Sequence, residues 1–352
     1  INVERASGKV QMTLVWNGQQ QNAPKKDTTT LDALVSALVA EGTKQKRRRG
    51  RKAMKQSTNN NDNKEFRLHS LWVHYNSSWK HANAIFDVNQ GTWEHRYGPE
   101  TLVETLRQTT VPLHFAPNVF RQANLDGFAK IVASIRKRIS NDFPCKPPTC
   151  LELYGGVGTI GLNLSHLLSS LTCSDENPFN ESCFMKSAAH LSSAESCVVS
   201  YVSKNATTMV RNGALGKAEI VIVDPPRKGL EEEVLKDLCS CSAPRLLVYV
   251  SCGFRAFQRD CTCLLESGVW SCDAAEGHLL FPGSDAIETL AFFCQKISET
   301  SRLMCNVCVC FTCCEKGISK DWGRKRLSFL GGENHREIKI QYRDGSPLCY
   351  SV

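Results

Sequence analysis

The stretch that decides the fold is Leu151–Leu164, with the sequence LELYGGVGTIGLNL. It opens with a short apolar run typical of a buried strand, which leads directly into a cluster of glycines. Gly156, Gly158 and Gly161 have the G-x-G-x-x-G spacing found where a strand turns into a helix beside a bound dinucleotide. Such glycines let the backbone approach a ligand closely, so the stretch predicts a nucleotide-type cofactor site without identifying the cofactor.

Two cofactor classes fit this loop. In a dinucleotide site the pyrophosphate lies at the helix N-terminus, and an acidic residue about 20 positions further on binds the ribose. Asp175 and Glu176 lie at that distance. In an S-adenosylmethionine site the same loop admits the amino-acid end of a cofactor that has no phosphate. The loop alone does not decide between these two cofactors. A third alternative is that the glycines serve only a tight turn.

The chain around the loop alternates between strand and helix patterns. Such alternation predicts a doubly wound, mostly parallel sheet, with ligands at the carboxyl ends of the strands. We therefore predict a Rossmann-like domain over residues 115–295. Its expected strands are Cys150–Tyr154, a strand ending near Cys173, Val198–Val202, Glu219–Val223, Arg245–Val250 and Glu288–Phe293, and its expected helices are Phe120–Ile139, one starting near Val157 and one after Pro178.

The flanking segments differ in character. Residues 1–114 predict a smaller α+β domain, with a strand at Val10–Trp16, a helix at Leu31–Gly42 and a polar, basic insertion at 43–65 that has no apolar period. Residues 296–352 lose the alternation, and we expect a poorly ordered extension. Its Cys305–Cys314 segment is too cramped for the usual spacing of zinc ligands, so we predict no metal site.

Composition limits the setting of the protein. The 352 residues include 18 cysteines, which in a chain of this length indicate reduced thiols and an intracellular reducing compartment. No apolar run reaches about 18 residues, so no membrane span is expected. The net charge is +8, and the run Lys44–Lys55 holds eight basic residues, which leaves 35 basic against 35 acidic residues elsewhere. An RNA contact, a nuclear-localisation signal and a solvated loop are all open for this run.

Three predicted strand ends carry chemical groups. Asp224 opens a rigid D-P-P-R corner, and Cys252 follows an apolar strand as a candidate nucleophile. Glu288 opens the apolar strand TLAFF, where a carboxylate is costly to bury and has the raised pKa that suits a general base. A dehydrogenase has no use for this cysteine and glutamate together.

In this order, FRQAN, LELYGGVGTIGL, VDPPRKGL, VYVSCGF and IETLAFF resemble the RNA uracil-5 methyltransferase family, over roughly Phe115–Gln295. The resemblance implies methylation of C5 of uridine in transfer or ribosomal RNA, with S-adenosylmethionine as cofactor, RNA as partner and a monomeric enzyme. It implies that Cys252 is the nucleophile and Glu288 the base. The residues that it implies for cofactor binding are Gln122, Tyr154, Gly156, Gly158, Asp175, Asn205 and Asp224.

The chain departs from the family at two places beside these residues. Gly253 and Phe254 stand where the family usually has Asn-Pro, and Ala286 stands where it usually has a histidine. The nucleophile and the base are both kept, so the departures bear on rate and substrate choice more than on the type of reaction. A catalytically impaired RNA-binding relative is the alternative.

Overall fold

The computed structural model describes residues 1–17, 25–43, 67–76, 91–191, 196–284 and 286–296, and two short paired strands, β14 (Ile340–Gln341) and β15 (Pro347–Leu348). The basic run Lys44–Lys55 and the cysteine-rich segment Cys305–Cys314 lie outside these ranges, and so do the predictions made for them.

A seven-stranded sheet forms the centre of the larger unit, in the order β12-β13-β11-β10-β7-β8-β9. The five strands from β11 to β9 run parallel, whereas β13 and β12 are antiparallel to their neighbours. The predicted doubly wound, mostly parallel sheet is thus confirmed. The strands are β7 (Thr149–Leu153), β8 (Ser170–Ser174), β9 (Val198–Val202), β10 (Ile220–Val223), β11 (Leu246–Ser251), β12 (Trp270–His278) and β13 (Glu288–Gln295).

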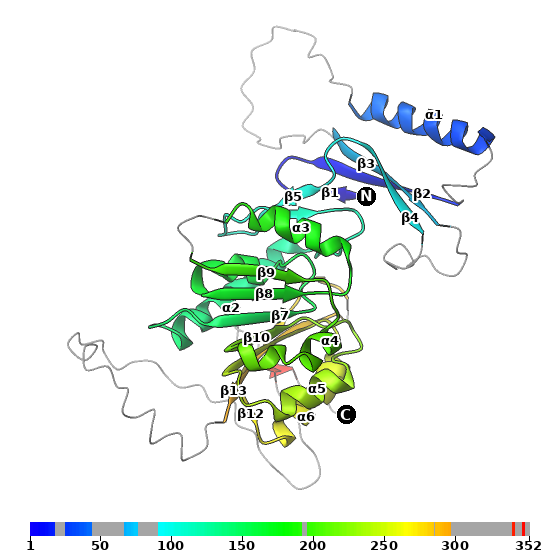
Figure 1. Cartoon of the computed structure of the whole chain (residues 1–352). Helices are drawn as coiled ribbons and strands as arrows, with labels where there is room; N and C mark the ends of the chain where they lie inside the picture. Colours follow the sequence, from blue (N-terminus) through cyan, green and yellow to red (C-terminus); the bar gives the residue numbers. More distant parts are fainter. Residues whose placement is uncertain are drawn as a thin grey trace.

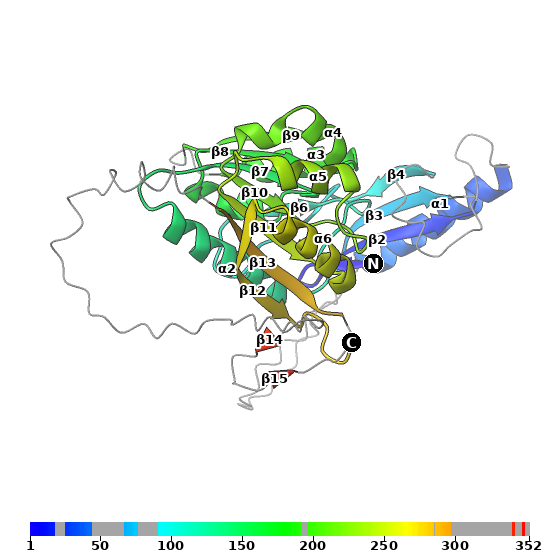
Figure 2. The ribbon, with the colours of Figure 1, turned by 90° about the horizontal axis from the view of Figure 1, so that it is seen from below.

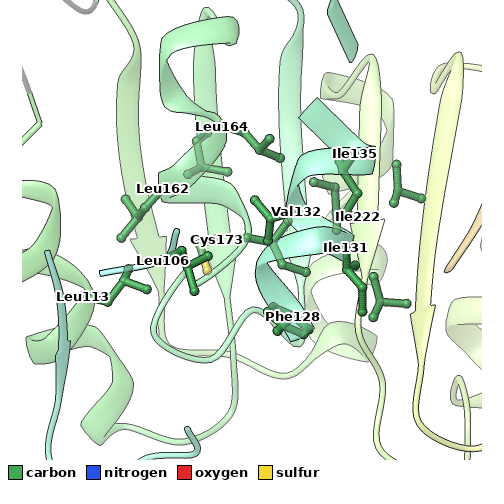
Figure 3. Close-up of a cluster of buried hydrophobic side chains, with 14 of the residues drawn as sticks. Leu106, Leu113, Phe128, Ile131, Val132, Ile135, Leu162, Leu164, Cys173 and Ile222 are labelled. Carbon is green, nitrogen blue, oxygen red and sulfur yellow. The ribbon is translucent and has the colours of Figure 1, made fainter. Parts of the chain in front are cut away.

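Helices cover both faces of this sheet (Figures 1 and 2). The central strands are apolar along their length because both of their faces are buried, as parallel sheets require. One face packs on α2 (Leu125–Asp142), on the 3-10 helix η2 (Gly161–Leu167) and on α3 (Phe179–Ala188); Figure 3 shows part of this core, including Phe128 and Ile131 of α2 and Ile222 of β10. The other face packs on α4 (Ala206–Arg211), η3 (Ala214–Lys217), α5 (Glu232–Ser240) and α6 (Phe254–Glu266).

The N-terminal unit is a separate four-stranded sheet with one long helix. Its strands lie in the order β1 (Asn2–Val3), β2 (Lys9–Trp16), β3 (Arg67–Tyr75) and β4 (Thr92–Tyr97), and β2 and β3 are parallel. Helix α1 (Lys25–Gly42) connects these two parallel strands and packs Leu31 and Val35 against them. The unit is thus a β-α-β arrangement with an antiparallel strand on each side (Figure 1).

The hairpin of β5 (Leu102–Glu104) and β6 (Leu113–Phe115) leads from the small sheet to the large one. Leu113 and Phe115 belong to the core of the large unit, where the backbone N–H of His114 donates to Ser187 Oγ (2.9 Å). Buried Glu104 accepts hydrogen bonds from Arg5 and Arg121 and so links the two units. Within the described ranges, no helix combines the length and the hydropathy of a membrane span.

The structure differs from the sequence-based expectations in four elements. Helix α1 begins at Lys25 and not at Leu31. Helix α2 begins at Leu125 and not at Phe120, because Asn124 Oδ1 caps it by accepting the Gly127 N–H (2.8 Å). After the glycine loop, turns and a 3-10 helix replace the expected helix near Val157, and the Gly161 N–H donates to Glu152 instead of to a carbonyl of the preceding turn. Strand β12 was not expected at all.

Candidate active site at the carboxyl edge of the sheet

Strand register brings the predicted chemical groups to one edge of the large sheet. Ser251, the last residue of β11, lies opposite Thr289, the second residue of β13. Cys252 follows Ser251 and Glu288 precedes Thr289, so the candidate nucleophile and the candidate base occupy adjacent positions on neighbouring strands. The antiparallel direction of β13 makes this possible, because it places the start of that strand beside the carboxyl ends of the parallel ones.

The glycine loop lies at the same edge and wraps around a buried carboxylate. Glu152 on β7 is 1% exposed, and its Oε2 accepts the Gly161 N–H at 3.1 Å. A Cβ on Gly155 would meet the Glu152 side chain at 2.9 Å and Cys173 Sγ at 2.4 Å, and one on Gly161 would meet Glu152 Oε2 at 2.4 Å. These glycines are therefore required by packing around Glu152.

Gly156 and Gly158 differ in what surrounds them. A Cβ on Gly158 would meet the ring of Phe184 at 2.6 Å, so its missing side chain serves the core. A Cβ on Gly156 would meet no atom within 4 Å, although the residue has a positive φ of 55°. The backbone at Gly156 therefore borders open space at the strand ends, which is the position that a cofactor would use.

Asp175 and Tyr154 hold the loop in place. The Gly156 N–H donates to Asp175 Oδ2 (3.0 Å), and the Asn177 N–H donates to Oδ1 of the same carboxylate (2.9 Å). Tyr154 has an unusual positive φ of 57°, and its hydroxyl donates to Glu231. Asn205 lies beyond the end of β9 and caps α4, since its Oδ1 accepts the Thr208 N–H (2.9 Å).

The D-P-P-R corner is fixed from beneath by Asp260. This carboxylate is fully buried and accepts the Leu230 N–H (2.9 Å) and the Tyr249 hydroxyl (2.7 Å). Arg259 pairs with it and also donates to the carbonyl of Lys228 (3.1 Å). Because Asp260 lies on α6 and Tyr249 on β11, these contacts tie the corner to the two elements that flank Cys252.

Cys252 is exposed, yet the protein around it shifts its ionisation. Partial desolvation raises the pKa of the thiol, and the carboxylates of Glu288 and Asp224 raise it further. The guanidinium of Arg227 acts in the opposite direction and lowers it. Glu288, Asp224 and Arg227 therefore all lie within electrostatic reach of the thiol.

Glu288 is 7% exposed, and within the described part of the chain its Oε1 has no hydrogen-bond partner. Burial raises the pKa of this carboxyl from 4.5 to about 7, against the opposing charges of His278 and Arg227. A buried carboxyl group that titrates near neutral pH and has an oxygen free to accept a proton has the properties of a general base.

Asp224 lies among further carboxylates at this edge. Burial raises its pKa well above the ordinary value, and the negative charges of Glu288, Glu152 and Asp175 raise it further. Four acidic groups thus act on one small region. Such a concentration of negative charge is unfavourable unless protons or a bound cation neutralise it.

Gln122 lies between β6 and α2, two residues before the cap residue Asn124. Asn124 Nδ2 donates to the carbonyl of Leu280 (2.7 Å), which holds the FRQAN segment against the loop that leads to Glu288. Strand register and electrostatic interactions thus bring together six of the predicted residues, namely Tyr154, Gly156, Asp175, Asp224, Cys252 and Glu288. Gln122 and Asn205 lie on the segments that precede α2 and α4.

Sequence reasoning missed four residues that shape the site, namely Arg227, Glu231, Asp260 and His278. Arg227 could be found as part of the D-P-P-R corner, and Asp260 could be found as the acidic residue after Arg259 on the helix that follows Cys252. His278 carried no usable signal, because strand β12 itself was not expected.

Comparison with known proteins identifies the family. None of the protein-family models matches the chain. An uncharacterized RNA methyltransferase of Protochlamydia amoebophila is 34% identical over 292 residues, which is 83% of this chain and 66% of that protein. The 23S rRNA (uracil(747)-C(5))-methyltransferase of Shewanella halifaxensis is 28% identical over 51% of this chain and 45% of its own length. The tRNA (uracil(54)-C(5))-methyltransferase of Pyrococcus horikoshii is 28% identical over 60% of this chain and 47% of its own length.

The chain therefore spans about two thirds of the first of these relatives and less than half of the other two. Among solved structures, the tRNA (uracil-54, C5)-methyltransferase of Pyrococcus abyssi, in complex with S-adenosyl-L-homocysteine, superposes with a TM-score of 0.50 at 23% identity, over 65% of this chain and 51% of that one. This likeness supports the fold. The sequence relatives show that the chain belongs to a family of RNA methyltransferases, and the relatives named above include an rRNA and a tRNA uracil-C5 enzyme.

Proposed function

We propose that this chain transfers a methyl group from S-adenosylmethionine to C5 of uridine in a structured RNA, through a covalent bond between Cys252 and C6 of the base. The observation that carries the proposal is the register of β11 and β13. A thiol and a buried carboxylate follow from it at adjacent positions, and among the described residues Oε1 of that carboxylate has no hydrogen-bond partner. One nucleophile and one base on the same pyrimidine are what this reaction needs.

The charge of the site favours S-adenosylmethionine over a dinucleotide. Asp224, Asp175, Glu152 and Glu288 form an acidic cluster, and each of the other three raises the pKa of Asp224. A cofactor with a sulfonium and an ammonium group neutralises such a cluster, whereas a pyrophosphate adds further negative charge to it. The open backbone at Gly156 and the neighbouring Asp175 then suit the amino-acid end and the ribose of that cofactor.

The thiolate of Cys252 performs the step that uracil cannot perform alone. C5 of uracil is a weak nucleophile, and a new bond between Sγ and C6 turns the C5–C4–O4 unit into an enolate with electron density at C5. When bound, S-adenosylmethionine supplies the electrophilic methyl group. Arg227 supports this step, because its positive charge favours the thiolate.

Glu288 completes the reaction. Its carboxylate takes the proton from C5, the electron pair of the C5–H bond forms the C5–C6 double bond, and the bond between Sγ and C6 breaks to release the thiolate. The pKa of about 7 lets Glu288 be ionised before the step and protonated after it at neutral pH.

RNA is the partner that this reaction implies, and the named relatives act on ribosomal and transfer RNA. A base inside a helix does not expose C6 to a thiol, so the target uridine has to leave its stack. We propose a structured RNA of one of these two classes as the substrate.

The test of the activity is to incubate the protein with methyl-labelled S-adenosylmethionine and total transfer or ribosomal RNA, and to digest the RNA to nucleosides. We expect labelled 5-methyluridine with the wild-type protein and none with Cys252→Ala. Lys228→Gln, an exposed charge change in the same corner, is the matched control and should keep the activity. RNA binding without any methyl transfer would contradict the proposal and favour the non-catalytic alternative.

The test of the cofactor is a binding measurement across pH. Because the pKa of Asp224 is raised, its negative charge develops only as the pH rises, and we expect the sulfonium cofactor to bind more tightly with increasing pH. S-adenosylhomocysteine lacks the sulfonium charge and should show a weaker pH dependence. Tight binding of NAD without binding of S-adenosylmethionine would overturn this assignment.

A further inference from the structure

The edge strand β12 places a histidine directly across from the proposed base. In the antiparallel pair of β12 and β13, His278 is the register partner of Glu288, and Glu276 is the partner of Leu290. Directly opposed residues on antiparallel strands project from the same face of the sheet, so His278, Glu276 and Glu288 share one face. The His278 side chain is 15% exposed, between buried Glu288 and the protein surface.

The His278 side chain contacts an exposed carboxylate on its own strand. His278 Nε2 lies 3.1 Å from Glu276 Oε2, and Glu276 is exposed. From α2, which packs on this face, Ser134 Oγ donates to the same Glu276 oxygen (3.0 Å). On the inner side the facing charged groups are Glu288 itself and, beyond it, Arg227 and Asp224. His278 is therefore the register partner of a buried carboxyl, Glu288, and the hydrogen-bond partner of an exposed carboxylate, Glu276.

We propose that His278 is a positioning and relay residue for Glu288, which takes the substrate proton from that carboxyl and passes it toward Glu276 and the solvent. The inference rests on the proposed function, since it concerns the proton that Glu288 removes from C5. His278 acts through Glu288 and does not touch the pyrimidine.

The proton balance of the relay is simple. After the C5–H bond breaks, Glu288 is a neutral carboxylic acid. Its O–H proton moves to the neutral imidazole of His278, which leaves Glu288 ionised for the next turnover and His278 as a cation beside the carboxylate of Glu276. The imidazolium then loses that proton to water. No oxidant, reductant or further reactant takes part.

The relay answers a physical need of the site. Glu288 is buried, so a proton that it has taken from the substrate needs a neighbouring group to carry it to the solvent. Histidine is the side chain that exchanges protons most readily near neutral pH, and it is the register partner of the base.

The experiment compares two assays on three His278 variants in the full chain. The first assay measures steady-state methylation of uridine, which requires Glu288 to be regenerated. The second measures the covalent adduct with RNA that contains 5-fluorouridine, in which C5 carries no proton to remove. The variants are His278→Gln, His278→Arg and His278→Ala, and His190→Gln is the control, because His190 is exposed and stacks on His114 of the β5–β6 hairpin.

We expect His278→Gln to lower turnover at pH 7 by about a hundredfold, as for the loss of one acid–base group, and to leave the rate of adduct formation unchanged. His278→Arg carries a guanidinium that cannot exchange its proton near neutral pH, so it should be equally slow. Added imidazole should restore part of the turnover of His278→Ala.

The possible failures are distinguishable. If the wild-type protein gives neither methylation nor adduct, the proposed function is wrong. If the wild-type protein is active and either His278→Gln or His278→Arg turns over at the wild-type rate, the relay is wrong. A loss of adduct formation that equals the loss of turnover would mean that His278 only supports the structure, and this result also overturns the proposal.

Discussion

At Cys252, two carboxylates and one guanidinium act on the same thiol. Glu288 and Asp224 raise the pKa of the thiol, beyond the effect of desolvation, and Arg227 lowers it. Arg227 also lowers the pKa of Glu288. A single exposed arginine therefore favours the ionised form of both the nucleophile and the base, although salt screens its effect because it faces the solvent.

We expect Arg227→Gln to raise the pKa of both groups and to shift the rising limb of the pH–rate profile to higher pH. The loss at pH 7 should be at most about tenfold, since a shift of one pKa unit changes the ionised fraction by that factor, and it should disappear at high pH. The profile of initial methylation rates against pH checks this. Lys228→Gln removes a neighbouring exposed cation and should leave the profile unchanged; an equal shift in both variants would contradict the specific role of Arg227.

Glu152 shows a conflict between position and stability. Its carboxylate organises the glycine loop, but burial raises its pKa from 4.5 to about 7, with a smaller contribution from Asp175. The folded state then holds a proton that the unfolded state releases. This bound proton stabilises the folded state fully below pH 4.5, and the stabilisation is lost as the pH rises through about 7. The free energy of unfolding falls by about 3 kcal/mol over this range.

Glu152→Gln should remove this pH dependence while its amide oxygen keeps an acceptor for the Gly161 N–H. We expect the free energy of unfolding of the variant to change less between pH 5 and pH 8 than that of the wild type, by about 1 to 3 kcal/mol. Urea unfolding at both pH values measures it. Glu219→Gln is the matched control, because Glu219 also accepts a backbone N–H, from Thr149 (3.2 Å). A wild-type pH dependence in Glu152→Gln would contradict the argument.

At the scale of elements, the site depends on how closely the turn after β11 approaches the D-P-P-R corner. A Cβ on Gly253 would meet the carbonyl oxygen of Arg227 at 2.4 Å and its Cα at 3.0 Å. The atoms that a side chain would meet belong to the backbone of the corner. Asp260 fixes this backbone by accepting the Leu230 N–H, so a shift of the corner is energetically unfavourable. In this structure the position beside Cys252 therefore has no room for a side chain.

Gly253→Ala should therefore displace the turn that carries Cys252 and lower the rate constant for methylation by about tenfold or more, because small misplacements of a reacting group are costly. Gly216→Ala is the control, since a Cβ there meets no atom within 4 Å and the residue has no positive φ. Single-turnover rates and thermal unfolding of both variants separate a local displacement from general unfolding. Wild-type rates in Gly253→Ala would show that the two loops move independently.

At the scale of the whole molecule, the sequence indicated the sheet and its chemical edge well. Apolar runs that end in Tyr154, Asp224 and Cys252 predicted parallel strands and therefore a shared edge, and the order of the motifs identified the family. The sequence could not give the direction of the last strands, because antiparallel and parallel strands show the same apolar pattern when both faces are buried. The register that sets Glu288 beside Cys252 and opposite His278 therefore required the structure.

The glycine loop illustrates the same limit on a smaller scale. The glycines of the loop look alike in the sequence but differ in their surroundings. Gly156 borders open space, Gly158 packs on Phe184, and the remaining two surround Glu152. The sequence also does not show that Glu152 is buried beneath the loop. These distinctions arise from contacts between residues that are distant in the sequence, which spacing alone does not encode.

The central claim is that Cys252 adds to C6 of a uridine and that Glu288 then removes the proton from C5. Incubation with S-adenosylmethionine and RNA that contains 5-fluorouridine tests it most directly, because fluorine at C5 cannot leave as a proton and the bond between the protein and the RNA persists. We predict a covalent complex that survives denaturation, forms with the wild-type protein and with Glu288→Gln, and is absent with Cys252→Ala. A complex that persists in Cys252→Ala, or no complex with an RNA that the protein methylates when it contains uridine, would contradict the claim.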